Sequence, residues 1–471
     1  MTKKRPILDP WFSRPIDWHR TINSPQAVAL IDDLWQGHFQ PHDKPRPGPK
    51  PRTAFKDQFA ALLVELLFAW LEDPELSLGV PFSVNAYDTR SRYNAPGMSK
   101  AIIPMMRTLQ EAGLLDVADG SYGGAGKGGN RNTRVRASVA LRERFRGLGA
   151  RPGDFSRRVD QECIVLRDGD IGLVDYTDTP ETNAMRTHLR AYNDVLAAAF
   201  IDVSTAEGHR VVTGVDRGQS IGPQHHFIHR VFSRGRWDCN GRFYGGWWQH
   251  LGSDIRRHIL INNTPTVEVD FRGMHLNILA AQAGVTLTDD PYAIDVPDNL
   301  SLDAGELRKV VKRLVLTALN ARDRDSAFRS FRDLWPTGHI AKTLTNAALN
   351  NLVDTIEARH PFLDALLFSD QGIGLMNIDA QIADLVHRHF TAQAVPVLSI
   401  HDSFIVDCCR VGELIRVMQD AAEAVTGVRL PFSRDGMGLD EVSEDIRDDL
   451  REWHEGRTVR CEGYLQRLAT K

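Results

Sequence analysis

The sequence predicts an α+β protein whose antiparallel sheet carries two aspartates and whose helices lie in separate regions. Three observations support this fold class. Residues 397–407 form two apolar, β-branched half-strands around the polar centre His401-Asp402-Ser403, a pattern typical of a tight hairpin with a carboxylate at its tip. Residues 267–271 show a second strand pattern, and this strand carries Asp270. Apolar residues three and four positions apart predict amphipathic helices before and between these strands.

Asp270 and Asp402 are the residues around which we interpret the rest of the chain. A carboxylate on a rigid strand is a good metal ligand, and two strand-borne aspartates that converge can hold two divalent ions, Mg²⁺ or Mn²⁺. Two such ions serve in-line phosphoryl transfer. The alternative is that the two aspartates are unrelated structural acids. The two interpretations differ in whether the fold brings the carboxylates together.

Length and composition limit the classes of protein to consider. A chain of 471 residues with 42% hydrophobic residues predicts two or three domains with ample cores. No run of 18 apolar residues and no secretory signal are present, so we expect a cytoplasmic protein without a membrane partner. The five cysteines are odd in number and include no C-x-x-C pair, which predicts reduced thiols and no zinc site.

Charge is distributed unevenly along the chain. The net charge of −4 does not indicate a nucleic-acid-binding protein. However, residues 121–160 contain ten Lys and Arg residues against three Asp and Glu residues. Because a local basic patch matters more for phosphate binding than the net charge does, this region is a candidate for contact with nucleic acid.

The first 150 residues predict a basic arm followed by a small module. Residues 1–53 are rich in proline, which interrupts helices and sheets, and in basic residues, so we expect an arm or linker. Residues 54–150 predict two helices, at about 54–72 and 98–113, and then a β-hairpin.

The hairpin is expected at 114–117 and 133–138, and its order after two helices resembles a winged-helix module. In that fold one helix enters a groove of DNA and the hairpin, or wing, touches phosphates. Winged helices also serve as protein-docking modules, so both kinds of partner stay open. The basic residues expected in the wing are Lys127, Arg131, Arg134 and Arg136.

The middle of the chain begins with a region of mixed character. Residues 151–224 predict a helix at about 183–200 and are treated as a connecting region. In the aromatic stretch that follows, Gly241 permits close backbone approach, Arg242 can bind a phosphate with its forked guanidinium, and Tyr244 can pack on a sugar or base. Taken alone, this stretch can equally be a strand–turn–strand with a structural arginine.

A further helix is predicted at 306–321. Arg308 and Lys312 are four positions apart and therefore share one face of this helix. A basic pair near two acids can hold the triphosphate of an incoming nucleotide, whereas the helix taken alone is better explained by a solvated basic face. After the 397–407 hairpin, an amphipathic helix beginning at 411 is expected to pack on the sheet.

Four of these elements together resemble one family of enzymes. Asp238-x-x-Gly241-Arg242-x-Tyr244 resembles the D-x-x-G-R-x-Y element of the single-subunit phage and mitochondrial RNA polymerases. Val269-Asp270 followed by Phe271-Arg272-Gly273-Met274-His275 is similar to motif A of that family and of the related family A DNA polymerases. Arg308-x3-Lys312-Arg313-x-Val315-x-Thr317 is similar to motif B, and His401-Asp402-Ser403 matches motif C in its RNA-polymerase form. The four elements occur in the family's order within about residues 230–445.

The resemblance implies a right-hand polymerase behind the winged-helix-like module. Its palm would carry the antiparallel sheet, and its fingers and thumb would be helical. The implied regions are a thumb-like connection at 151–224, the first part of the palm at 225–300, the fingers at 301–390, and the second part of the palm with C-terminal helices at 391–471. The implied reaction is nucleotidyl transfer that uses a DNA template and nucleoside triphosphates and releases pyrophosphate.

The resemblance also implies roles for residues in catalysis. Asp270 and Asp402 would bind the two metal ions, with help from the carbonyl of Phe271. Lys312 would contact the triphosphate and is also a candidate proton donor to pyrophosphate. His401 would lie beside the primer terminus.

Other residues would bind the substrates. The residues implied in nucleotide binding are Arg308, Lys312, Arg313, Asn320 and His275. Those implied in nucleic-acid binding are Arg242, Gly241 and Tyr244, together with the wing residues.

Three positions make the choice of sugar ambiguous. Asn320-Ala321 stands where the family has Tyr-Gly, and Ser403 stands where DNA polymerases usually have glutamate. His275 occupies a position where DNA polymerases place a glutamate that blocks the 2′-hydroxyl and RNA polymerases place glycine. Its imidazole would either clash with a 2′-hydroxyl or donate a hydrogen bond to it. The similarity at 238–244, 312–317 and 401–403 favours the hydrogen bond and the use of NTPs.

We therefore expect a compact polymerase that makes RNA or primers, with two Mg²⁺ or Mn²⁺ ions as cofactors. One alternative is a DNA polymerase that replicates a mobile element. The alternative from another class is a non-catalytic DNA-binding protein, such as a replication initiator or regulator built on a decayed palm. Retention of both aspartates and of both basic residues of motif B argues against decay.

Overall fold

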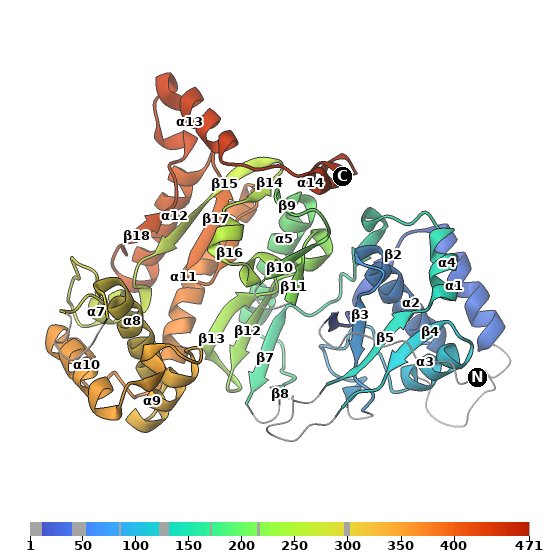
Figure 1. Cartoon of the computed structure of the whole chain (residues 1–471), viewed down its shortest axis with the longest axis horizontal. Helices are drawn as coiled ribbons and strands as arrows, with labels where there is room; N and C mark the ends of the chain where they lie inside the picture. Colours follow the sequence, from blue (N-terminus) through green and yellow to red (C-terminus); the bar gives the residue numbers. More distant parts are fainter. Residues whose placement is uncertain are drawn as a thin grey trace.

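The computed structural model describes residues 12–39, 53–83, 86–121, 131–169, 172–213, 217–295 and 302–470 (Figure 1). Most of the expected N-terminal arm and Lys127 lie outside the described residues. The described residues form two separate hydrophobic cores, one within residues 27–155 and the other within residues 163–439. The chain therefore packs as an N-terminal module, here residues 12–157, followed by a larger unit (Figure 1). Within the part of the chain that is described, no helix is both long enough and apolar enough to cross a membrane.

The N-terminal module packs helices on a small sheet. Its elements are β1 (Ser13–Pro15), β2 (Arg20–Ile22), α1 (Pro25–His38), α2 (Phe55–Glu72), β3 (Ser77–Val80), α3 (Ile102–Glu111), β4 (Leu115–Ala118), β5 (Thr133–Ala137), α4 (Val139–Arg146) and β6 (Phe155–Arg157). The sheet has the order β1-β3-β5-β4, and β5 is antiparallel to both β3 and β4. These elements confirm the two helices and the hairpin that the sequence predicts. β2 and β6 pair separately.

The sequence of each helix in this module explains its position. α2 is apolar around most of its circumference and is buried along its length, as expected of a helix at the centre of a core. α1 begins where Ser24 accepts a hydrogen bond from the amide of Ala27, with Pro25 in the first turn. Ser138 caps α4 in the same way.

A six-stranded sheet lies at the centre of the larger unit. Its strands are β9 (Ile201–Val203), β14 (Ile259–Ile261), β15 (Thr264–Phe271), β16 (Leu398–Ile400), β17 (Ser403–Asp407) and β18 (Phe432–Arg434). The order is β16-β17-β15-β14-β9, β18 also pairs with β15, and each of these pairs is antiparallel. The predicted hairpin at 397–407 is confirmed as β16–β17. β15 is the central strand, and most of its residues are buried.

The larger unit contains a second, four-stranded sheet. Its strands are β7 (Ile164–Asp168), β8 (Gly172–Leu173), β12 (His229–Ser233) and β13 (Arg236–Tyr244), in the order β13-β12-β7-β8. The predicted helix at 183–200 is α5 (Pro180–Ala198). Because β7 pairs with β12 and β9 pairs with β14, the region 151–224 shares both sheets with the residues that follow it. Among the described strands, β10 (Arg210–Thr213) and β11 (Arg217–Ser220) pair only with each other.

Helices cover the sheets and form a lobe beside them (Figure 1). They are α6 (Ser253–Arg256), α7 (Met274–Gln282), α8 (Ala304–Asn320), α9 (Arg324–Asp333), α10 (Asn346–Arg359), α11 (Gly372–Ala392), α12 (Val411–Thr426), α13 (Glu444–Gly456) and α14 (Glu462–Ala469). α7–α10 form the lobe, whereas α11 packs against β13 and α12 packs against β15 and β17. α8 and α12 confirm the helices predicted at 306–321 and from 411. α8 begins at Asp303, which accepts a hydrogen bond from the amide of Glu306 at 2.9 Å.

Candidate active site

The two predicted aspartates lie at the same end of neighbouring strands. β15 and β17 are antiparallel, and Asp270 stands opposite Ser403 in their register. Asp402 is in the two-residue tip of the β16–β17 hairpin, directly before Ser403. Its carbonyl accepts a hydrogen bond from the amide of Phe271 at 3.2 Å, which ties the tip to the end of β15. The fold thus brings together two carboxylates that are far apart in the sequence.

The electrostatics at Asp270 reflect this convergence. Burial raises the pKa of Asp270 to about 7, and the negative charge of Asp402 acts in the same direction. Lys312 opposes both effects, so its ammonium group lies within electrostatic range of Asp270. Asp402 and Lys312 therefore both lie within electrostatic range of Asp270. A pair of carboxylates ionises fully only when a further positive charge lies near it.

This donor set fits divalent ions that also bind substrate phosphates. Carboxylate oxygens are hard ligands, and Mg²⁺ in enzymes that act on phosphates commonly takes one or two carboxylates from the protein. Among the described residues, no group of three or more His, Cys, Asp or Glu side chains is placed to hold a metal ion. Asp270 and Asp402, at the same end of neighbouring strands, are two carboxylates that could hold such an ion.

A third carboxylate, Glu268, precedes Asp270 by two positions and so lies on the same face of β15. Arg256 donates to both of its oxygens, at 2.9 and 2.7 Å, and the hydroxyl of Ser403 donates to one of them at 2.9 Å. These bonds neutralise Glu268 and hold it in place beside the aspartate pair. No local sequence pattern singles out this residue or its arginine partner.

α8 presents its basic residues in different directions. Arg308 and Lys312 both face the ring of Tyr292, whose centroid is 5.9 Å from the guanidinium carbon of Arg308 and 6.0 Å from Nζ of Lys312. Burial raises the pKa of Tyr292, and the charge of Asp402 acts in the same direction, so this phenol lies within electrostatic range of Asp402. Arg308 also forms an ion pair with Asp290.

Arg313 lies away from this group. Its guanidinium carbon is 4.1 Å from the ring centroid of Trp335, and it donates to the carbonyl of Leu334 at 3.2 Å. Asn320 is at the end of α8, where its amide donates to the carbonyl of Leu316. Of the residues that motif B implies for nucleotide binding, Arg308 and Lys312 thus lie beside Tyr292, and Lys312 also acts on Asp270.

Arg242 and His275 meet at a buried carboxylate that the sequence did not single out. Arg242 Nε donates to Asp379 Oδ1 at 2.9 Å, and His275 Nε2 lies 3.1 Å from Asp379 Oδ2. Asp379, on α11, is 1% exposed, so this cluster is internal. Although burial opposes it, the bond to Asp379 raises the pKa of Arg242, and Asp402 contributes in the same direction. The cluster therefore lies within electrostatic range of Asp402.

These contacts change the expected roles of Arg242 and His275. The guanidinium of Arg242 is bound to Asp379, so a phosphate of template or primer would have to share it. His275 has one ring nitrogen at Asp379, and the other, Nδ1, is buried without a partner among the described residues. In this arrangement Asp379 holds one nitrogen and the other is buried, and the expected contact of His275 with a 2′-hydroxyl stays a prediction.

The aromatic stretch packs against the hairpin tip. Tyr244 and His401 form an edge-to-face pair with ring centroids 5.5 Å apart. Burial and the charge of Arg242 lower the pKa of His401, so its imidazole is neutral near pH 7. Gly241 has φ +93°, and an added Cβ would lie 2.9 Å from the ring of Phe232. Close packing of β13 accounts for this glycine.

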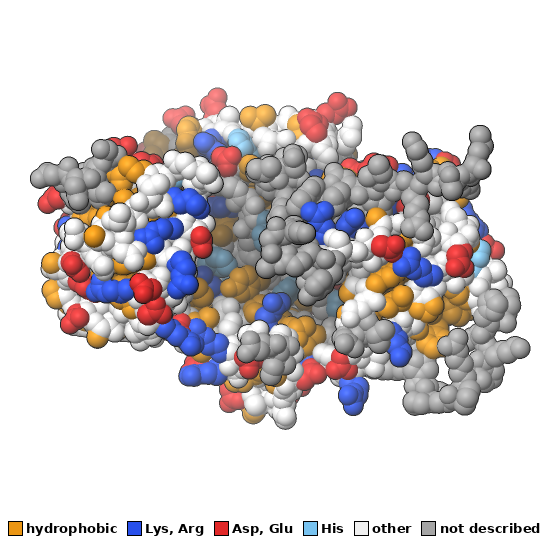
Figure 2. Space-filling model, turned by 60° about the horizontal axis from the view of Figure 1, so that its bottom comes forward, with side chains coloured by type: hydrophobic (Ala, Val, Ile, Leu, Met, Phe, Trp, Pro, Cys, Tyr) orange, Lys and Arg blue, Asp and Glu red, His pale blue; other side chains and the backbone are white. Residues whose placement is uncertain are grey.

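The wing residues differ in how much charge they offer. Arg136 is 11% exposed in its side chain and forms ion pairs with Glu75 and Asp116. Its charge is therefore largely neutralised within the module. Arg134 lies at the start of β5, and Arg131 lies just before this strand, where it pairs with Ser121. Figure 2 shows that Lys and Arg side chains also gather on the α7–α10 lobe, beside the hollow at the centre of that view.

Comparisons with known proteins add a likeness to solved structures. No protein-family model matches the chain, and no curated protein matches it. The chain is similar to the POL domain of Pol1 from M. smegmatis, solved in complex with DNA primer-template and dNTP, at 13% identity and a TM-score of 0.29. The aligned part covers 58% of this chain and 57% of that one, so the chain spans little more than half of the domain that it matches. A likeness of this degree carries no conclusion about activity.

Proposed function

We propose that this chain is a template-directed nucleotidyltransferase that extends a nucleic acid from nucleoside triphosphates. The observation that carries the proposal is the convergence of Asp270 and Asp402 at the ends of β15 and β17, with Lys312 within electrostatic range of Asp270. Two aspartates on a rigid sheet and a lysine opposite are the groups that a two-metal phosphoryl transfer requires.

Each group has a role in the proposed reaction. Two divalent ions, when bound, would activate a 3′-hydroxyl and neutralise the departing pyrophosphate. Asp270 and Asp402 would hold these ions, while Lys312 would bind the triphosphate and give a proton to pyrophosphate. Arg308 would reach the same phosphates after leaving Asp290. His401, kept neutral and packed on Tyr244, would lie beside the primer terminus without repelling the metal site.

The proposal assigns a role to each region. The central sheet would be the palm, the α7–α10 lobe the fingers, and the N-terminal module a winged-helix-like unit that contacts the DNA template. The resemblance at 238–244, 312–317 and 401–403 favours RNA or primer synthesis over DNA synthesis. The partners would be DNA and nucleoside triphosphates, with Mg²⁺ or Mn²⁺ as cofactor.

Incorporation of labelled nucleotides tests the proposal. The full chain is incubated with Mg²⁺ and single-stranded DNA, with and without a primer, and with NTPs or dNTPs. We expect EDTA to abolish incorporation and Asp270→Asn or Asp402→Asn to lower its rate on the order of 10³-fold, because each change removes a ligand charge.

Asp407→Asn is the matched control. Asp407 is the last residue of β17, at the end of the strand away from the site. One of its carboxylate oxygens accepts a hydrogen bond from the amide of Cys409, and the side-chain oxygen of asparagine can accept the same bond. We expect this variant to retain activity. Near-normal incorporation by a folded Asp270→Asn or Asp402→Asn protein would refute the proposed metal site.

A further inference from the structure

Asp290 interacts with two arginines beside the candidate active site. Arg308, on α8, forms an ion pair with it. Arg272 follows Asp270 by two positions, its side chain is exposed, and its charge also acts on Asp290. The groups proposed for catalysis include neither Arg272 nor Asp290. Two arginines thus interact with one carboxylate, and one of them is two residues from a proposed metal ligand.

The chain segments that carry Arg272 and Asp290 pack side by side. Gly273, the residue after Arg272, has φ +57°, and a Cβ added to it would lie 2.8 Å from Cγ of Pro291. Pro291 is in turn held by His360 at the end of α10, whose Nε2 donates to the carbonyl of Pro291 at 2.9 Å. Asp290 is therefore fixed next to the turn that follows β15.

The carboxylate of Asp290 is ionised and also shapes its own loop. Its Oδ1 accepts a hydrogen bond from the amide of Tyr292 at 3.1 Å, in a turn typical of Asp and Asn. Burial opposes ionisation, but the bond from Arg308, the amide of Tyr292 and the charges of both arginines lower the pKa of Asp290. The negative charge is therefore present at neutral pH. Asparagine in its place would keep the turn and lose the charge.

The ring of Tyr292 connects this carboxylate with the proposed nucleotide site. The guanidinium carbon of Arg308 and Nζ of Lys312 lie 5.9 and 6.0 Å from the centroid of this ring. Besides burial, the charges of Asp402, Arg308 and Asp290 all act on the pKa of its hydroxyl. A carboxylate of the protein therefore already binds one of the two cations that are proposed to bind the triphosphate.

A carboxylate tethered next to a phosphate-binding arginine competes with phosphate for it. Carboxylate and phosphate oxygens both accept the paired N–H groups of a guanidinium. Because the carboxylate belongs to the same chain, it acts at a high effective concentration and lowers the affinity of any phosphate that needs the same arginine. It also stays in place when a ligand leaves, so it can return to the arginine as soon as the phosphate departs.

We propose that Asp290 is a built-in competitor of the incoming triphosphate, and that Arg272 is a phosphate-binding residue of the same site. The phosphate chain displaces the carboxylate from Arg308 and accepts hydrogen bonds from Arg308 and Arg272. When pyrophosphate leaves, the ion pair between Asp290 and Arg308 forms again. These roles rest on the proposed function, since they require a nucleoside triphosphate to bind beside Asp270 and Asp402.

Isothermal titration calorimetry of the full chain in Mg²⁺ tests the role of Asp290. The probe is the α,β-methylene analogue of ATP, which binds as a triphosphate but cannot transfer its nucleotide. We expect Asp290→Asn to bind the analogue about two- to fivefold more tightly than the wild type, the range that a partly exposed ion pair supports. A residue with only a structural role would give the opposite sign, because its loss loosens the site.

A double-mutant cycle shows whether the gain depends on Arg308. In an Arg308→Ala background, Asp290→Asn should change the affinity far less, because the guanidinium for which the carboxylate competes is gone. Glu306→Gln is the matched control. It removes the same charge from an exposed ion pair on the same helix, that of Glu306 with Lys309, and we expect the affinity of the wild type.

Arg272→Ala tests the second arginine. We expect it to weaken binding of the analogue by about tenfold or more, because a charge-assisted hydrogen bond to phosphate is lost. Arg460→Ala is its control, since it removes an equal charge from an exposed side chain just before α14, far from the α7–α10 lobe in Figure 1. We expect this variant to bind like the wild type.

The opposite results overturn these roles. An unchanged or weaker affinity in Asp290→Asn, an equal gain in Glu306→Gln, or an equal gain without Arg308 overturns the role of Asp290. Unchanged binding by Arg272→Ala overturns that of Arg272, and an absence of saturable binding in every protein overturns both.

Incorporation of nucleotides is measured separately, so the two proposals fail in different ways. A chain that incorporates nucleotides but shows none of these changes in affinity refutes the roles of Asp290 and Arg272 alone. Tighter binding by Asp290→Asn in a chain that incorporates no nucleotide refutes the polymerase proposal alone.

Discussion

At the scale of single residues, the aspartate pair lowers the stability of the metal-free folded protein. Burial, and then the charge of Asp402, raise the pKa of Asp270 to about 7, whereas an aspartate in an unfolded chain has a pKa of about 3.9. The folded state therefore binds this proton more tightly than the unfolded state. Its contribution to stability declines as the pH rises from about 4 to 7, and the full penalty is present above pH 7.

We expect Asp270→Asn to raise the Tm of the metal-free protein at pH 8 and to give no gain at pH 3, where the aspartate is protonated in both states. Calorimetry in EDTA measures this. Mg²⁺ should raise the Tm of the wild type, because an ion that binds only the folded state stabilises it, and should have little effect on the variant. A variant less stable than the wild type at pH 8 would show that the two carboxylates do not repel each other.

Sequence could predict the residues that carry a distinctive chemical pattern, but not those that support them. Asp402 stands out because a polar triplet interrupts an apolar strand pattern. Asp379 has a weaker signal, a carboxylate between the apolar residues Ile378 and Ala380 of α11. Its partner Arg242 is 137 residues away, and no local pattern connects the two. His275 shows the same limit, because its position in the motif did not reveal that its ring turns to Asp379.

At the scale of elements, the geometry of a helix turns two adjacent basic residues of α8 in different directions. Lys312 acts on Asp270, whereas Arg313 is turned by about 100° and stacks on Trp335. The same element thus contains a residue proposed for catalysis and a neighbour of equal charge outside the site.

We expect Lys312→Ala to raise the KM for nucleotide and to lower kcat, with a loss in kcat/KM of about 10²-fold, because the triphosphate gains charge in the transition state. Arg313→Ala should leave both constants close to those of the wild type. Steady-state kinetics over a range of nucleotide concentrations measure the difference. Equal kinetics for the two variants would assign α8 a solvated basic face only.

The elements themselves were predictable where a strong period governs them. The helices α2, α3, α8 and α12 and the hairpin β16–β17 follow from apolar spacing and from a polar interruption. Strand partners did not follow in the same way. β7 and β9 are short and apolar, and their pairing with β12 and β14 depends on residues far along the chain. The sequence therefore did not reveal that both sheets continue across the expected boundary at residue 225.

At the scale of the whole molecule, the N-terminal module is expected to contribute to binding of DNA through its wing. Each phosphate contact adds about 0.9 to the slope of log K against log salt. We expect the double variant Arg131→Ala/Arg134→Ala to weaken binding of a DNA duplex by the full chain and to lower this slope by about 1 to 2. Fluorescence anisotropy over a range of salt concentrations measures it.

Arg136→Ala serves as the comparison for the wing. The charge of Arg136 is already matched by Glu75 and Asp116, so its loss should change the slope less than the double variant does. An unchanged slope in Arg131→Ala/Arg134→Ala would show that the wing does not touch phosphates and would favour a protein-docking role for the module.

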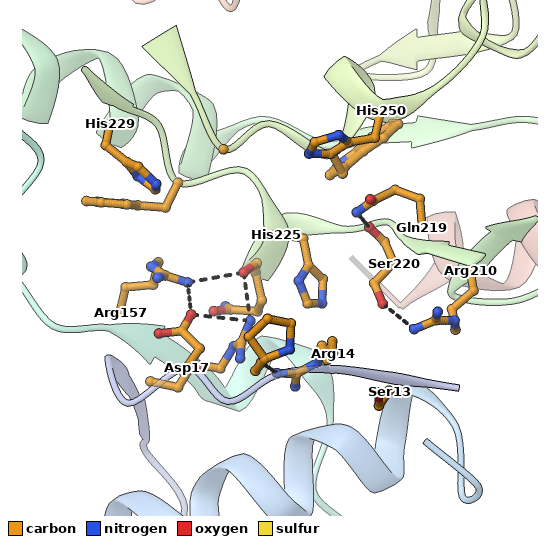
Figure 3. Close-up of a pocket in the computed structure, with 16 residues that line it drawn as sticks. Ser13, Arg14, Asp17, Arg157, Arg210, Gln219, Ser220, His225, His229 and His250 are labelled. Atoms are coloured by element: carbon orange, nitrogen blue, oxygen red, sulfur yellow. Dashed lines mark hydrogen bonds and ion pairs between the residues drawn. The ribbon is translucent and has the colours of Figure 1, made fainter. Parts of the chain in front are cut away.

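A cavity of about 570 Å³ between the two units, lined in part by Arg14, Arg157 and Arg210 (Figure 3), illustrates what a linear sequence conceals at this scale. Its lining comes from four stretches of the chain, 13–20, 157, 210–229 and 245–250, that are far apart in the sequence. Each arginine alone resembles an ordinary surface residue. These residues share one space only because β1, β6 and β10 meet the segment 245–250 in the fold.

The two hydrophobic cores share no residue, and polar contacts such as those of Glu72 with His225 and of Arg20 with Gln224 connect the units that contain them. Substitutions at separated sites without shared partners act almost additively on the free energy of unfolding. A change inside one core is therefore energetically local, and its effect adds to that of a change in the other. Selection can alter what the N-terminal module recognises without repacking the sheet that holds Asp270 and Asp402. The two parts of this chain are free to evolve at different rates.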